Sequence, residues 1–140
     1  MSKVIIALTD ISARLNHKKK YYDWIEDVIK SEGLSLGSIS IILCSDEYLL
    51  EINRSFLNHD YYTDIITFDY REGNVISGEL YISIDRVKEN ASGYNQPYLT
   101  ELARVMVHGV LHLCGYKDKA PKEVVVMRKK EEEKIKMLAL

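Results

Sequence analysis

This sequence has few cysteines, no long apolar run and a small net charge. The two cysteines, Cys44 and Cys114, lie in separate apolar runs outside any CxxC pair, so we expect buried free thiols rather than a disulfide. No run reaches the roughly 18 apolar residues of a membrane-spanning helix, so we expect no membrane segment. A net charge of −2 gives no overall sign of nucleic-acid binding, but an overall value can hide a local basic patch.

The length and the N-terminal segment indicate one domain in the cytoplasm. A chain of 140 residues is long enough to bury a sizeable core without disulfides, so we expect a single domain over residues 1–140. The apolar run that begins at Val4 stops at Thr9 and Asp10, too early for the core of a secretory signal peptide. We therefore expect a strand at this position and a cytoplasmic protein.

Hydrophobic periodicity predicts the order β, α, β, α, β, β, α, α, α. Ser45 and Asp85 are expected to cap two of the helices, and Gly33 and Gly93 to end two. This order is typical of an α+β fold, here a small mixed sheet of about four strands packed by helices. The strands are expected at residues 4–8, 38–44, 63–70 and 78–84, and the helices near residues 21–29, 46–56, 85–93, 98–114 and 121–136.

Residues 108–118 carry the most specific pattern in the chain. His108 and His112 are four residues apart in an apolar, helical segment, so their imidazoles share one face and can hold one cation. Gly115 can end this helix in the left-handed conformation, which turns the chain back and brings Asp118 to the same cation. Three protein ligands leave a fourth position open, as in catalytic zinc sites. We therefore predict one zinc ion, or another divalent transition metal, at these three side chains.

Two simpler interpretations stay open for these residues. Each histidine can be a core residue that bonds a backbone carbonyl or a side chain, because buried polar groups cost free energy unless they are satisfied. Asp118 lies shortly before Pro121 and can instead help to cap the last helix. The joint spacing of the three residues favours the metal site.

The same pattern resembles the zinc-binding segment of metzincin-type proteases, with one large difference. Those proteases use a glutamate directly after the first histidine as general base, and Gly109 stands in its place here. The segment thus has the metal-binding residues without the peptidase base, which argues against peptide hydrolysis.

Several segments together resemble the YbeY family of bacterial metal-dependent endoribonucleases. Residues 108–116 resemble the family signature H-G-x-L-H-L-x-G-Y, and Met127 and Glu131 fit a further M-x-x-x-E pattern. Residues 52–53, 63–68 and 78–83 resemble its L-N, T-D-V-L-S-F and G-D-[IL]-x-I-S segments. The resemblance extends from about residue 37 to the end, and it implies the fold of that family with a zincin-like metal-binding helix.

Asp118, Lys117 and Leu57 depart from the family pattern. Asp118 stands where the family usually has its third metal-binding histidine, and Lys117 where it usually has aspartate. Leu57 stands where many members carry an arginine thought to contact RNA, and His59 can supply a positive or hydrogen-bonding group instead. From their positions, His59 near the place of that arginine and the two lysines beside Asp118, we expect His59 and Lys117 to be catalytic, and His59, Lys117 and Lys119 to hold substrate phosphates near the metal.

The resemblance implies cleavage of single-stranded RNA, in 16S ribosomal RNA maturation and ribosome quality control. Ribosomal RNA and the small ribosomal subunit are then the expected partners. A metal that activates water or polarises a phosphoryl oxygen suits phosphodiester cleavage, but the residues do not choose between water and the RNA 2′-OH as nucleophile. Two alternatives stay open: a metallohydrolase of another substrate, and a non-catalytic ribosome-assembly or RNA-binding factor stabilised by its metal.

Overall fold

Nine helices and strands occur in residues 3–12 and 14–139, the residues that the computed structural model describes. Their order is the predicted one, and the predicted α+β class is confirmed. The elements are β1 (Lys3–Leu8), α1 (Lys18–Ser31), β2 (Ser35–Cys44), α2 (Asp46–Leu57), β3 (Ile65–Asp69), β4 (Val75–Ser83), α3 (Ile84–Gly93), α4 (Tyr98–Leu113) and α5 (Pro121–Leu138).

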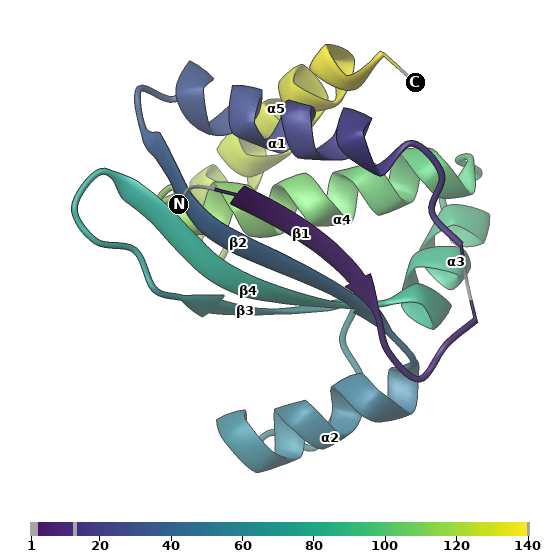
Figure 1. Cartoon of the computed structure of the whole chain (residues 1–140). Coiled ribbons are helices and arrows are strands. Elements are labelled where there is room, and N and C mark those ends of the chain that lie inside the picture. Colours follow the sequence, from purple (N-terminus) through teal and green to yellow (C-terminus); the bar gives the residue numbers. More distant parts are fainter. Residues whose placement is uncertain (1–2, 13, 140) are drawn as a thin grey trace.

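The strands form one mixed sheet in the order β1-β2-β4-β3 (Figure 1). β1, β2 and β4 run parallel, whereas β3 pairs antiparallel with β4 at one edge. In that pairing Thr67 lies opposite Leu80, and Asp69 lies opposite Gly78. Paired residues point to the same face of a sheet, so Thr67 and Asp69 share a face with Leu80, which is fully buried. This face is the one that receives α4.

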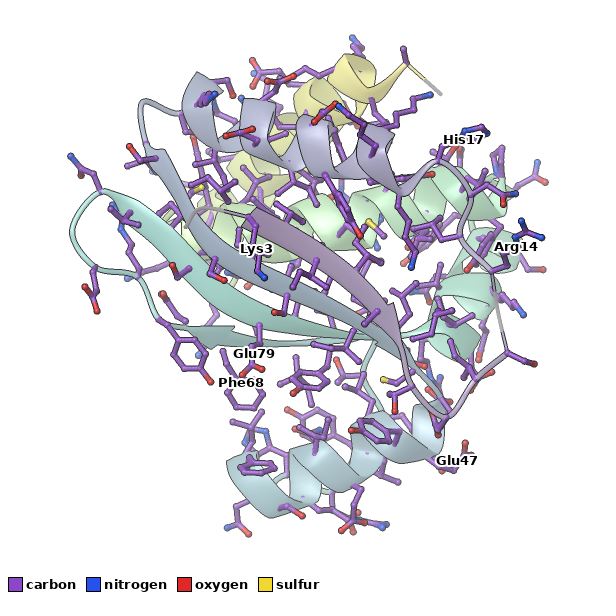
Figure 2. All side chains as sticks on the ribbon, in the orientation of Figure 1. Lys3, Arg14, His17, Glu47, Phe68 and Glu79 are labelled. Carbon is purple, nitrogen blue, oxygen red and sulfur yellow. The ribbon has the colours of Figure 1, made fainter. Side chains whose placement is uncertain are left out.

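The helices cover the two faces of the sheet unequally (Figure 1). α1, α4 and α5 lie on one face, where α4 contacts β3 and β4 and contributes to the main hydrophobic core. α2 lies alone on the opposite face, and Phe68 and Glu79 point toward it in Figure 2. Phe68, Tyr81 and Ile52 belong to a second, smaller apolar cluster there. α4 is therefore held between the sheet and two helices, as expected for a helix that is apolar on nearly all sides.

The prediction that Asp85 caps a helix of its own is wrong. Ser83 caps α3, and its Oγ accepts a hydrogen bond from the backbone N–H of Arg86 at 3.2 Å. Asp85 instead accepts from the backbone N–H of Asp46, the first residue of α2, at 2.8 Å. A carboxylate is favoured there because the N-terminus of a helix carries a partial positive charge. The Ser45 cap of α2 is confirmed.

Three strands differ from the prediction by more than one residue at a boundary: β2, β3 and β4, of which β4 begins at Val75 rather than residue 78. β2 begins at Ser35 rather than residue 38, and its pairing with β4 is irregular between Leu36 and Ile39. The irregularity interrupts the alternation of apolar and polar residues, which is the signal that locates a strand in a sequence. β3 is shorter than predicted and spans Ile65–Asp69, so residues 63–64 belong to the loop that precedes it.

Both cysteines are free thiols, as predicted. Cys44 is buried, and burial together with nearby acidic groups raises the pKa of its thiol to about 12. Cys114 is only partly buried. Among the described helices, none is long and apolar enough to cross a membrane.

Candidate metal centre

The end of α4 brings the predicted ligands together. Gly115 has a φ of 108°, which terminates the helix as expected. The N–H of Gly115 donates to the carbonyl of His112, and the N–H of Tyr116 donates to the carbonyl of Leu111, each at 3.0 Å. This pair of bonds is the Schellman motif, which folds the chain back over the last helical turn. Asp118 is returned in this way to the face of α4 that carries the histidines.

Three ligand atoms converge at this point. The Nε2 atoms of His108 and His112 are 3.1 Å apart. The Oδ2 atom of Asp118 lies 3.1 Å from the first and 3.3 Å from the second. The alternative interpretation, that Asp118 helps to cap the last helix, is not required, because the side chain of Glu123 accepts from the Ala120 N–H at the start of α5.

The other ring nitrogens show that this donor set fits a cation. Nδ1 of His108 faces the Glu131 carboxylate at 2.5 Å, and Nδ1 of His112 faces the Tyr116 carbonyl at 2.9 Å. Carboxylate and carbonyl oxygens accept hydrogen bonds, so each Nδ1 carries the proton and each Nε2 of a neutral ring presents a lone pair. Two lone pairs and a carboxylate oxygen then point at one another, and they repel unless a positive charge lies among them.

A buried charge network holds His108 from the opposite side. The Glu131 carboxylate is 2% exposed and also lies 3.3 Å from Arg104 Nη1. Arg104 forms two further bonds, at 2.6 and 2.9 Å, to the buried carboxylate of Glu101. Burial alone raises the pKa of Glu131, but the bonds and charges of His108 and Arg104 outweigh burial and hold the pKa below its ordinary value. Carboxylates so placed fix the orientation and tautomer of a metal-binding histidine.

Glu131 belongs to a family-like pattern in the sequence, but neither Glu131 nor Arg104 was predicted to support the site. A signal for Glu131 is nonetheless present in α5, whose buried residues recur at intervals of four, three and four: Met127, Glu131, Lys134 and Leu138. A carboxylate on the buried stripe of a helix requires a partner, because an isolated buried charge is costly. That partner cannot be named without knowing that α5 packs on α4.

A second network supports His112 through Tyr116. The Tyr116 hydroxyl donates to Glu32 Oε1 at 2.5 Å, and the same carboxylate lies 2.8 Å from Lys134 and 3.1 Å from Lys130. Burial alone raises the pKa of Glu32, but hydrogen bonds from Lys134, Tyr116 and Lys130 outweigh burial and lower the pKa from 4.5 to about 2. Glu32 therefore ties α1 and α5 to the residue whose carbonyl orients His112.

This lowered pKa predicts a pH-dependent stability. A carboxyl whose folded pKa lies below its unfolded pKa stabilises the fold above the unfolded pKa and loses that contribution as the pH falls to the folded value. We expect Glu32→Gln to be less stable than wild type by about 3 kcal/mol at pH 7, and the difference to shrink as the pH falls from about 4.5 toward 2. Urea unfolding in chelator at several pH values measures this difference.

The matched control is Glu26→Gln, which removes a partly exposed carboxylate of α1 that is paired with the exposed Lys30 at 3.5 Å. Exposed pairs of this kind contribute about 1 kcal/mol or less, so this control is expected to stay near wild type throughout. A constant difference between Glu32→Gln and wild type across that pH range would contradict the assignment.

Gly109 occupies a position with no room for a side chain. A Cβ atom there would lie 2.7 Å from Ile65 Cδ1 and 2.9 Å from Leu80 Cδ2. α4 can approach β3 and β4 this closely only because the residue is glycine. The position that supplies the general base of zincin proteases is thus packed against the sheet, which agrees with the argument against peptide hydrolysis.

The ligand atoms face a polar pocket of about 480 Å³ between α4 and β3. Burial raises the pKa of Asp64 on its wall, although the nearby Arg104 and His108 act in the opposite direction. The other lining residues, besides His108, His112 and Asp118, are Thr63, Ile65, Thr67, Asp69 and Leu113.

The three predicted phosphate-binding residues lie outside this lining. Lys117 and Lys119 are exposed on either side of Asp118 in the chain. His59 is exposed in the loop between α2 and β3, where its Nδ1 atom lies 3.0 Å from the hydroxyl of Tyr61. The structure thus brings the three metal-binding candidates together and leaves the other three at the surface.

Comparison with known proteins connects this site to a family. A sequence model of the family described as Endoribonuclease YbeY matches residues 7–139. The chain belongs to the YbeY endoribonuclease family. Among YbeY relatives, the protein named endoribonuclease YbeY from Flavobacterium psychrophilum is 51% identical over 128 residues, 91% of each chain. The one from Christiangramia forsetii is 53% identical over 121 residues, 86% of this chain and 85% of the relative.

The solution structure of TM1509 from Thermotoga maritima has the same fold. It superimposes with a TM-score of 0.66 at 29% identity, and the match covers 96% of this chain and 88% of that one. Membership of the YbeY family also confirms the prediction of an enzyme, an endoribonuclease that hydrolyses phosphodiester bonds. Metal ligation and the roles of His59, Lys117 and Lys119 stay predictions.

Proposed function

We propose that this chain is a metal-dependent endoribonuclease specific for single-stranded RNA, acting in 16S ribosomal RNA maturation and ribosome quality control. The observation that carries the proposal is the convergence of His108 Nε2, His112 Nε2 and an Asp118 oxygen within 4.8 Å of one another beside a polar pocket, in a chain of an endoribonuclease family. Ribosomal RNA and the small ribosomal subunit are the proposed partners, and the cytoplasm is the proposed location.

His108, His112 and Asp118 are the proposed ligands of one divalent ion, for which zinc is our first choice. Imidazole and carboxylate donors in a set of three are typical of catalytic zinc sites, while the carboxylate also admits manganese or nickel. When bound, the ion supplies Lewis-acid polarisation of a phosphoryl oxygen and a water of lowered pKa. Glu131 and the Tyr116 carbonyl keep the two imidazoles oriented by holding their Nδ1 protons.

The basic residues around the pocket are proposed to position the RNA. Lys117 and Lys119 flank Asp118 in the chain and are both exposed, so their ammonium groups are free to approach phosphates on either side of the reacting one. His59 precedes the pocket residues Thr63 and Asp64 by a few positions and offers a further donor.

Charge reversal at Lys117 tests this placement. Lys117→Glu is expected to weaken binding of a short single-stranded RNA about tenfold and to lower the slope of log affinity against log salt by about 0.7, because a phosphate contact is lost. Metal content per chain is expected to stay at the wild-type level. Fluorescence anisotropy in chelator measures the affinity, and elemental analysis measures the metal.

Lys3→Glu is the matched control, because Lys3 is exposed on β1 at the sheet edge opposite β3 and the pocket (Figure 2). An RNA affinity of Lys117→Glu equal to that of the control would exclude the phosphate contact.

The proposed activity is tested by cleavage and by rescue. Purified wild-type protein is expected to cut single-stranded RNA in preference to duplex, whereas His112→Ala is not. In cells that lack their own YbeY protein, wild type is expected to restore 16S ribosomal RNA processing and His112→Ala to leave the defect. Full rescue by folded His112→Ala would instead favour the non-catalytic assembly factor.

A further inference from the structure

The loop between α2 and β3 presents exposed aromatic rings at the edge of the metal pocket. Tyr61 is 55% exposed and Tyr62 is 48% exposed, and the next two residues, Thr63 and Asp64, line the pocket. Consecutive Cα atoms are about 3.8 Å apart, so both tyrosines start within about 8 Å of the pocket wall. Both rings are therefore accessible to a ligand that extends from the pocket.

The backbone of this loop is fixed at both ends. Asn53 is 2% exposed and its Nδ2 donates to the carbonyl of Tyr61 at 2.8 Å, while its own carbonyl accepts from the His59 N–H at 3.0 Å. The Asp64 carbonyl accepts from the Ser83 N–H in β4 at 2.9 Å. The aromatic rings therefore project from a held backbone, so little conformational entropy is lost when a ligand contacts them.

The aromatic rings of the loop are oriented so that their faces can stack on a planar ligand. His59 and Tyr61 are stacked, with ring centroids 5.2 Å apart and an angle of 22° between their planes. Tyr62 has the guanidinium of Arg86 over its ring at 5.0 Å, and Arg86 is in turn held by Asp46 at 3.1 Å. A tyrosine with a cation on one face keeps its other face for a second planar group.

The charges around the loop permit an anionic chain to approach. Asp60 is paired with Arg54 at 2.5 Å. Arg86 behind Tyr62 is likewise paired, with Asp46, so these charges balance one another and do not oppose an anion. The surface thus suits a planar group on a chain that extends from the metal pocket, and an unpaired nucleotide next to the one being cut has these properties.

We propose that His59, Tyr61 and Tyr62 form a stacking platform for unpaired nucleobases beside the scissile phosphate. This proposal rests on the RNA substrate of the proposed function, and it adds a recognition element that acts on bases rather than phosphates. Bases inside a duplex are not available for such stacking, so the platform also supplies a physical reason for preferring single strands.

Binding of a fluorescent hexa-adenylate in chelator, without cleavage, tests the platform. The second probe is a hexamer of abasic ribose phosphates, which carries the same charges and no bases. Wild type is expected to bind hexa-adenylate at least about tenfold more tightly than the abasic probe, because each base–aromatic stack contributes about that factor. The Tyr61→Ala, Tyr62→Ala double variant, which keeps only His59 of the platform, is expected to lose most of this preference.

Two further variants separate stacking from other effects. Tyr61→Phe keeps the ring and loses only the hydroxyl contact with His59, so it is expected to retain the wild-type preference. Tyr94→Ala removes a tyrosine that is 56% exposed at the end of α3 and does not line the metal pocket, so it is the matched control. Both hydrogen bonds of Asn53 go to main-chain atoms of the loop, so none of these substitutions removes either bonding atom.

The outcomes distinguish the stacking platform from the single-stranded RNA substrate on which it rests. If wild type prefers hexa-adenylate and the double variant keeps that preference, the platform is excluded while RNA binding stands. If wild type binds both probes equally, the platform is again excluded. If wild type binds neither probe, the single-stranded RNA substrate is excluded, and the platform with it.

Discussion

His112→Ala is expected to reduce bound metal from about one ion per chain to almost none. The substitution removes one of three converging ligand atoms and leaves His108 and Asp118 without a third partner. Loss of a residue that merely orients a ligand costs about 10–100-fold in metal affinity, so loss of a ligand is expected to cost at least 100-fold. Elemental analysis after purification without chelator, followed by zinc titration of the stripped protein, measures the effect.

The aspartate ligand needs its own comparison. Asp118→Ala is expected to lose metal as His112→Ala does, whereas Asp118→His is expected to retain it, because imidazole is an equally good zinc donor. His17→Asn is the control, since His17 is an exposed histidine with a φ of 60° and asparagine tolerates that conformation. Metal retained by Asp118→Ala would remove Asp118 from the ligand set. A wild type that takes up no zinc would make both histidines core residues.

Arg104→Met is expected to lower the free energy of unfolding by about 3–5 kcal/mol. Arg104 lies between two carboxylates, those of Glu101 and Glu131, that are each 2% exposed, and it is the arginine that pairs with both. Removing one partner of a buried charge network leaves the remaining charge uncompensated, which costs far more than the net contribution of the intact network. Urea unfolding of the metal-free protein measures the change.

Arg54→Met is the matched control for this result. Arg54 pairs with Asp60 at the surface, where its side chain is 50% exposed, and an exposed pair contributes about 1 kcal/mol or less. A loss in Arg104→Met no larger than in the control would show that the network contributes little to stability. Metal affinity of Arg104→Met is expected to fall as well, because Glu131 then lacks the charge that holds it against His108.

The fold was predictable where local patterns determine it. The order of the nine elements follows from runs of apolar residues with period 2 or 3.6, and the predicted starts of β2 and β4 are wrong at the end of the pair where their pairing is irregular. The cap at Asp85 was mispredicted because the N-terminus it serves, that of α2, is far away in the sequence. When a residue of one element caps a helix elsewhere in the chain, the local sequence pattern does not indicate which helix is capped.

The same division runs through the candidate site. His108, His112, Gly115 and Asp118 were predictable because one helix and one Schellman turn place them, with no help from the rest of the chain. The residues that support these ligands were not predictable from local spacing, since Glu131 is 23 residues from His108 and Glu32 is 84 residues from Tyr116. Such partners meet only when α1 and α5 pack on α4, and periodicity does not specify which helices meet.

The distance in sequence between ligands and supports has a consequence for the order of events in folding. A chain in which α4 has formed but α1 and α5 have not docked has its proposed ligands on one helix and the turn that follows it, with both imidazoles free to rotate. Helix formation takes about a microsecond, whereas pairing of distant parallel strands such as β1, β2 and β4 is slow. We therefore expect tight metal capture to mark the last stage of folding, and its rate after dilution from urea to report when the three helices assemble.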